Sequence, residues 1–130
     1  MNRALAIIGA AAAAVLILGW LVWPTHPGAL VLHAGTPHYV VTTTVDSVRV
    51  GMTAVDVDLN GRTNGVTTPS TVEIEAEMPL MGHVTPPVIL TSVGGGHYHA
   101  DGLDLMMTGP WELRLSIDTD HLTLPISVSG

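Results

Sequence analysis

The chain of 130 residues contains no cysteine, no lysine and no phenylalanine. Without cysteine it can form no disulfide, so a folded domain must depend on its apolar core. After residue 23, three arginines stand against eleven carboxylates, and this net charge of −8 argues against a nucleic-acid partner. The chain also lacks a Gly-x-Ser-x-Gly motif and a glycine-rich phosphate loop. No pairing of a nucleophile with a base is evident either, so we expect no enzyme, no catalytic residues and no small-molecule substrate.

A long apolar segment lies near the N-terminus. Residues 4–23, ALAIIGAAAAAVLILGWLVW, carry no charge and reach the roughly 20 residues that a helix needs to cross a bilayer. Trp20 and Trp23 lie at its end, where indoles favour the membrane interface, and Arg3 precedes it. We therefore predict a transmembrane anchor over residues 1–23 of a single-pass cell-membrane protein whose C-terminal domain lies outside the cytoplasm. The alternative is a cleaved signal peptide, which would leave the domain in the same place.

The rest of the chain has the pattern of a β domain. Residues 24–37 are rich in proline and glycine and are expected to form a linker. Residues 38–130 consist of short β-branched runs broken by turn residues, without a helical period. Residues 70–78 alternate cleanly between apolar side chains and glutamates, as in a strand with one buried face. About seven such strands predict an all-β, immunoglobulin-like antiparallel β-sandwich after the transmembrane helix.

Several glycines and prolines predict where these strands reverse or end. Asn60-Gly61 is a strong turn pair, and the three glycines at 94–96 permit a tight reversal. Gly102 is expected to bend or interrupt the strand that follows. Pro125 favours an edge position for the last strand, because proline cannot donate a backbone hydrogen bond.

Methionine and histidine gather in two segments, MPLMGH at 78–83 and HYHADGLDLMM at 97–107. Two ligand candidates share the loop of the first segment. On an extended strand, the two histidines of the second segment project to one face, while its last two methionines point to opposite faces. Thioether and imidazole suit Cu(I), imidazole also suits Cu(II), and a site without thiols resists oxidation to a disulfide. The candidate metal ligands, for a copper ion, are Met81, His83, His97, His99, Met106 and Met107.

Packing offers a second interpretation of some of these residues. Methionine is a common gap-filler in small cores, and Met78 continues the apolar side of its strand. Met107 likewise has the parity of the leucines before it, while Tyr98 and Trp111 are expected to be core aromatics. Packing does not require a methionine and a histidine in a loop. The favoured ligands are therefore Met81, His83, His99 and one of Met106 and Met107, with His97 as a substitute for His99.

The same segments resemble the YtkA-like domain family, over about residues 38–118. The shared pattern is a strand ending in MP-x-MGH, a Gly-x-Tyr strand, and M-x-G-x-W opening the next strand. The residues that carry it are Met78, Pro79, Met81, Gly82 and His83, then Gly96 and Tyr98, then Met107, Gly109 and Trp111.

The resemblance implies a small extracytoplasmic β-sandwich, related to the FixH-like proteins of cytochrome oxidase assembly. It also implies a link to copper or to copper-enzyme assembly, beside a membrane protein partner. The expected function is therefore copper binding and delivery. The alternative is an interaction module without metal that supports assembly of a membrane complex.

Overall fold

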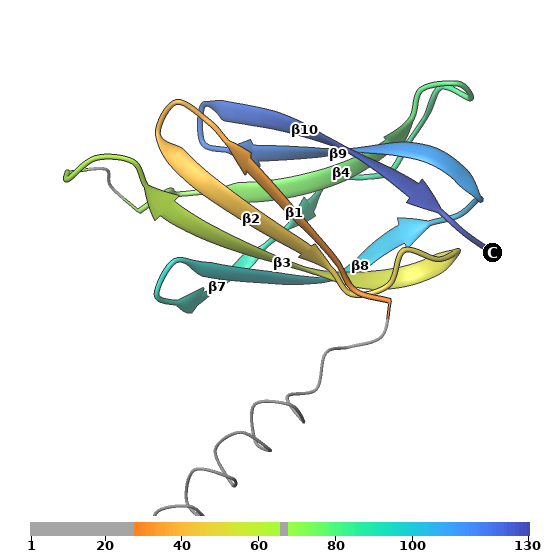
Figure 1. The fold of residues 1–130 in the computed structure, drawn as a ribbon, viewed down its shortest axis with the longest axis horizontal. Helices are drawn as coiled ribbons and strands as arrows, with labels where there is room; N and C mark the ends of the chain where they lie inside the picture. The colour runs from red at the N-terminus through yellow and green to blue at the C-terminus, as the bar shows by residue number, and fades with distance from the viewer. Residues whose placement is uncertain (1–27, 66–67) are drawn as a thin grey trace, which may run out of the picture.

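The computed structural model describes residues 28–65 and 68–130, and these form two antiparallel β-sheets (Figure 1). No helix within this described part is long and apolar enough to cross a membrane. The predicted anchor over residues 1–23 lies outside the described residues. The all-β prediction with two antiparallel sheets is confirmed.

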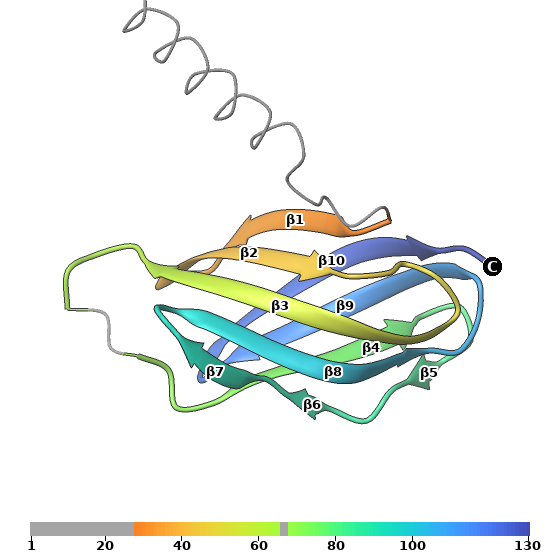
Figure 2. The same cartoon turned by 90° about the horizontal axis from the view of Figure 1, so that it is seen from below.

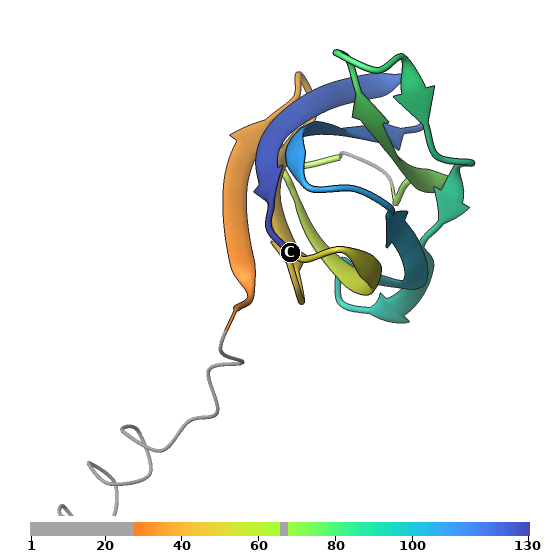
Figure 3. The same ribbon diagram turned by 90° about the vertical axis from the view of Figure 1, so that its right-hand side faces the viewer.

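Each sheet contains five strands, and the two sheets face each other around the core (Figures 2 and 3). The first sheet has the order β1 (Leu30–Gly35), β2 (Tyr39–Val45), β3 (Gly51–Gly61), β8 (His97–Leu105), β7 (Thr91–Gly94). The second has the order β10 (Asp120–Val128), β9 (Gly109–Ile117), β4 (Val72–Met78), β5 (His83–Val84), and β6 (Val88–Ile89) also pairs with β4. The MPLMGH segment (78–83) thus joins the end of β4 to the start of β5, and Met106 and Met107 directly follow the end of β8.

The core consists of the inward-facing side chains of both sheets. Strand β4 alternates buried and half-buried positions along its whole length, as predicted from its sequence. Tyr98 and Trp111 are buried, so these two aromatics do fill the core of a domain without phenylalanine. The largest fully buried side chains are Trp111, Ile74, Leu103, Leu105, Leu113, Leu115 and Ile117, followed by Val41, Val45, Val55, Val57 and Val72.

The glycine hairpin between β7 and β8 confirms the predicted reversal. Gly94, Gly95 and Gly96 all have positive φ, of 95°, 63° and 81°. A β-carbon on Gly96 would lie 2.5 Å from the carbonyl oxygen of Leu59, so only glycine fits there. Gly102 also has a positive φ, and the pairing of β8 with β3 shifts register beside it, as expected of a bent strand.

The predicted turn at Asn60-Gly61 is wrong, because β3 continues through both residues and pairs Gly61 with Tyr39. Arg62 explains the extension. Its backbone N–H donates to the carbonyl oxygen of His38, and its Nε donates to that of Thr36 at 2.7 Å. The predicted edge position of the last strand is confirmed, since β10 with Pro125 ends the second sheet.

The linker prediction for residues 24–37 is wrong over Leu30–Gly35, which form β1 and pair with β2 along their full length. The alternate residues Leu30, Leu32 and Ala34 are partly buried and pack against the core. This apolar alternation is short and lies between prolines and glycines. Because those residues are typical of loops, the sequence pattern indicated a linker and not a strand. The sandwich therefore begins at Leu30 and not at residue 38.

Removing β1 is expected to lower the free energy of unfolding by about 2–4 kcal/mol, from the lost burial of two leucine side chains. It would also leave β2 as an exposed edge, which favours aggregation. The measurement compares urea unfolding of two fragments, residues 28–130 and residues 36–130. Equal unfolding midpoints would show that β1 adds nothing to the domain.

Candidate functional site

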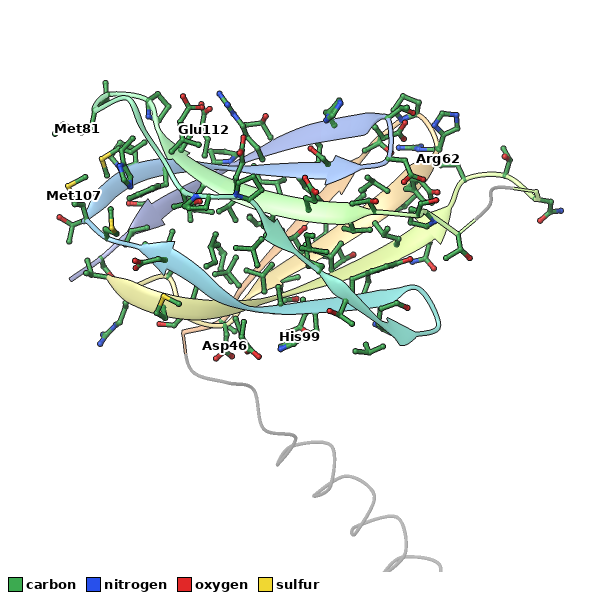
Figure 4. The ribbon with its side chains drawn as sticks, turned by 180° about the vertical axis from the view of Figure 1, so that it is seen from behind. Asp46, Arg62, Met81, His99, Met107 and Glu112 are labelled. Carbon is green, nitrogen blue, oxygen red and sulfur yellow. The ribbon has the colours of Figure 1, made fainter. Side chains whose placement is uncertain are left out.

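The six predicted metal ligands lie in two separate parts of the sandwich, and Figure 4 labels Met81 and Met107 in one part and His99 in the other. Met81, His83, Met106 and Met107 lie at one end, in or beside the β4–β5 and β8–β9 turns. We call this the methionine end. His97 and His99 lie on the outer face of β8, in the other sheet from the β4–β5 turn. The structure therefore does not bring His99 to the loop of Met81 and His83, as the favoured ligand set required.

The β4–β5 turn holds Met81 away from the core. The backbone N–H of Met81 donates to the carbonyl oxygen of Met78 at 3.1 Å, and Gly82 follows with a φ of 62°. Met78 and His83 then pair across the turn. This tight reversal leaves Met81 66% exposed, so its thioether is free to meet a ligand from solvent.

His83 packs at the rim of the core, against Trp111 of β9. The two rings meet edge to face, with centroids 5.8 Å apart and planes at 89°. The Nε2 atom of His83 is buried and has no hydrogen-bond partner within residues 28–65 and 68–130. Because buried polar atoms are nearly always satisfied, this nitrogen calls for an explanation such as an ion or a water molecule.

Trp111 contacts both His83 and the β8–β9 turn that carries Met106 and Met107. Its Nε1–H donates to the carbonyl oxygen of Met107 at 2.9 Å, and this bond ties β9 to the β8–β9 turn. Met107 is half-buried and packs against the core, whereas Met106 is 48% exposed. The predicted parity of these two residues is confirmed.

Met78 lies beneath the same end and belongs to the core. It is 4% exposed, and a β-carbon added to Gly109 would lie 3.5 Å from its Cε. Its role in packing, expected from its strand, is confirmed. The methionine end thus offers the exposed thioethers of Met81 and Met106, the half-buried thioether of Met107 and the buried ring nitrogen of His83, which is a soft donor set suited to Cu(I).

The histidines on β8 face aspartates across the sheet. His97 contacts Asp58, and His99 Nδ1 lies 2.7 Å from Asp56 Oδ1. The second ring nitrogen of His99 lies 3.2 Å from Asp101 Oδ1. The hydrogen bonds with Asp56 and Asp101 raise the pKa of His99. Both nitrogens of His99 are therefore occupied, and nowhere in the part of the chain that the structure describes do three His, Asp or Glu side chains form a metal-binding group.

A buried carboxylate at the opposite end was missed from the sequence. Asp120 is only 5% exposed. It accepts a hydrogen bond from the backbone N–H of His38 at 3.1 Å, and its other oxygen lies 2.8 Å from His38 Nδ1. Hydrogen bonds from the Thr36 side chain and from His38 lower its pKa. A cavity of about 390 Å³ adjoins these groups. More than eighty residues separate His38 from Asp120, so no local sequence signal connects them.

The contribution of Asp120 to the stability of the fold can be tested by unfolding the domain at acidic pH. Because the pKa of Asp120 is lowered in the folded state, its ionised form stabilises the fold above the unfolded pKa of about 3.9. This contribution is lost as the pH falls through that value toward the lower folded pKa. We expect the free energy of unfolding to fall more steeply between about pH 5 and pH 2 in the wild type than in Asp120→Asn. Urea unfolding across this range measures it, with exposed Asp46→Asn as the control. Parallel curves for wild type and Asp120→Asn would refute it.

A family model described as YtkA-like matches residues 34–116. This range contains the β4–β5 turn, the His-x-His strand and all of the Trp111 strand except its last residue, so the predicted resemblance is confirmed. Neither a curated protein nor a solved structure matches the chain.

Proposed function

The chain belongs to the YtkA-like family, and on this premise we propose that it is a membrane-anchored, extracytoplasmic copper-handling protein. It would hold one Cu(I) ion as cargo at the methionine end and exchange it with a membrane protein partner. The single observation that carries this proposal is the buried Nε2 of His83, which has no partner among the described residues and lies two residues after the exposed Met81. No catalytic role is proposed.

The ligands we propose are His83, Met81 and Met107, with Met106 as an alternative to Met107. Met81 comes from the β4–β5 turn and Met107 from the β8–β9 turn, and Trp111 connects the two turns through its contacts with His83 and Met107. Thioether and imidazole donors favour Cu(I), and none of them can be lost to disulfide formation outside the cytoplasm. His97 and His99 are left out, because the aspartates of β3 and β8 already engage them.

Methyl NMR of the full chain in detergent micelles tests the ligand set. The chain has six methionines, and each contributes one Cε methyl signal. One equivalent of Cu(I) is expected to shift the signals of Met81 and Met107 and to leave that of Met52, on β3, in place. Equal shifts at Met52, or no shift at Met81, would contradict the proposed site.

The second candidate is an interaction module that holds no metal and supports assembly of a membrane complex. It is favoured by a run of exposed apolar side chains between the β4–β5 turn and β7, which are Leu80, Met81, Val84, Ile89 and Val93. Such a module would tolerate loss of His83 and would instead fail to capture its membrane partner when Ile89 and Val93 are replaced by serine. Copper binding that depends on His83 would argue against it.

A further inference from the structure

Three loops and the chain's C-terminus lie together at the methionine end. The loops are the β2–β3 loop (46–50), the β4–β5 turn (79–82) and the β8–β9 turn (106–108). Figure 1 shows all three at the end where the C-terminus is marked. They form the end surface of the sandwich, across the ends of both sheets.

The chain also enters the domain on this side. Gly28, the first described residue, lines a cavity together with Ser47, Arg49 and Ser129. The apolar run of the sequence ends at Trp23, five residues before Gly28. Five extended residues span at most about 17 Å. An anchor over residues 1–23 would therefore hold the methionine end close to the bilayer surface.

The distribution of charge on the domain favours contact with the membrane through this end and not through the outer faces of the sheets. Eight of the eleven carboxylates lie on the outer faces of the two sheets, which are Asp56, Asp58, Asp101, Asp104, Glu73, Glu75, Glu77 and Glu112. The three loops carry one carboxylate, Asp46, and one arginine, Arg49. The flat faces would thus be repelled by anionic headgroups, whereas the side chains of the three loops carry no net charge.

The same end surface presents large apolar side chains to solvent. They are Val50, Leu80, Met81 and Met106. Leu80 is 81% exposed at the tip of the β4–β5 turn, where core packing gives no reason for a leucine. Apolar side chains with a neighbouring arginine are typical of surfaces that sit in the membrane interface.

We propose that the methionine end docks on the lipid surface of the membrane, with Leu80 and Met81 in the interface. This inference rests on the membrane anchor of the proposed function. The copper ligands would then face the membrane, so that the ion is exchanged with a site at the bilayer surface and not with a soluble carrier.

A single-cysteine label measures this contact, and the natural chain has no cysteine to remove. The full chain with Leu80→Cys, carrying a fluorophore, is reconstituted into phosphatidylcholine–phosphatidylglycerol vesicles that contain a lipid with a headgroup nitroxide. Quenching of about twofold or more is expected, because interfacial side chains lie within about 5–10 Å of the headgroup boundary. Asn64→Cys, exposed at the opposite end, is the matched control and should stay unquenched.

The outcomes separate the inference from the function on which it rests. Equal quenching at both positions, or at neither, while the chain floats with the vesicles would overturn the docking and leave the anchor standing. Quenching at position 80 that requires added membrane proteins would also overturn it, in favour of a protein partner. A chain that fails to float with vesicles would overturn the anchor and the docking together, without bearing on copper binding.

Discussion

Replacing Trp111 by alanine is expected to lower the free energy of unfolding by about 3–5 kcal/mol, the usual range for a buried tryptophan. Trp111 is 1% exposed and is the largest side chain in a core without phenylalanine. The substitution also removes its hydrogen bond to the carbonyl oxygen of Met107 and its edge contact with the His83 ring.

Urea unfolding of the fragment 28–130 measures this effect as a lower midpoint at unchanged slope. Met106→Ala is the control, because its side chain is exposed and should change the stability by less than about 0.5 kcal/mol. A loss below about 1 kcal/mol in Trp111→Ala would mean that the core repacks around the cavity.

The double variant Met81→Ala/His83→Ala is expected to bind Cu(I) at least about 100-fold more weakly than the wild type, because loss of even an outer-shell group commonly costs 10–100-fold. Met81 is exposed and His83 lies at the rim of the core, so the sandwich should survive the change. Competition with a chromophoric chelator under anaerobic conditions gives the affinity of each variant.

A matched control replaces the same residue types elsewhere. Met52→Ala/His97→Ala removes a thioether and an imidazole from the β3–β8 face, and its Cu(I) affinity should equal that of the wild type. Equal losses in the two double variants would place copper on scattered surface groups and would refute a site at the methionine end.

Local patterns in the sequence were sufficient to predict most of the strands. The alternation of β4, the glycines of the β7–β8 hairpin and the edge proline of β10 each specify their structure within a few residues. Strand β1 was missed because prolines and glycines surround three apolar positions. The Asn60-Gly61 turn failed because Arg62 is held by a residue pair that is distant in sequence.

The candidate site, too, could be predicted from the sequence only where its residues are close together in the chain. Met81 and His83 share a turn, so their proximity follows from the sequence alone. Placing His99 with them required knowing which sheet each strand joins, and the topology puts β8 and β4 in different sheets. The contact between His83 and Trp111, like the pairing of His38 with Asp120, joins residues far apart in the chain and becomes visible only in the fold.

The most direct test of the copper site is a titration of the full chain with Cu(I), without oxygen, against a chelator of known affinity. We predict that one equivalent of Cu(I) binds with a dissociation constant in the nanomolar range or tighter. This corresponds to a binding free energy of about −12 kcal/mol or more favourable. No binding above the chelator background would contradict the copper site and assign the chain to the assembly-module function.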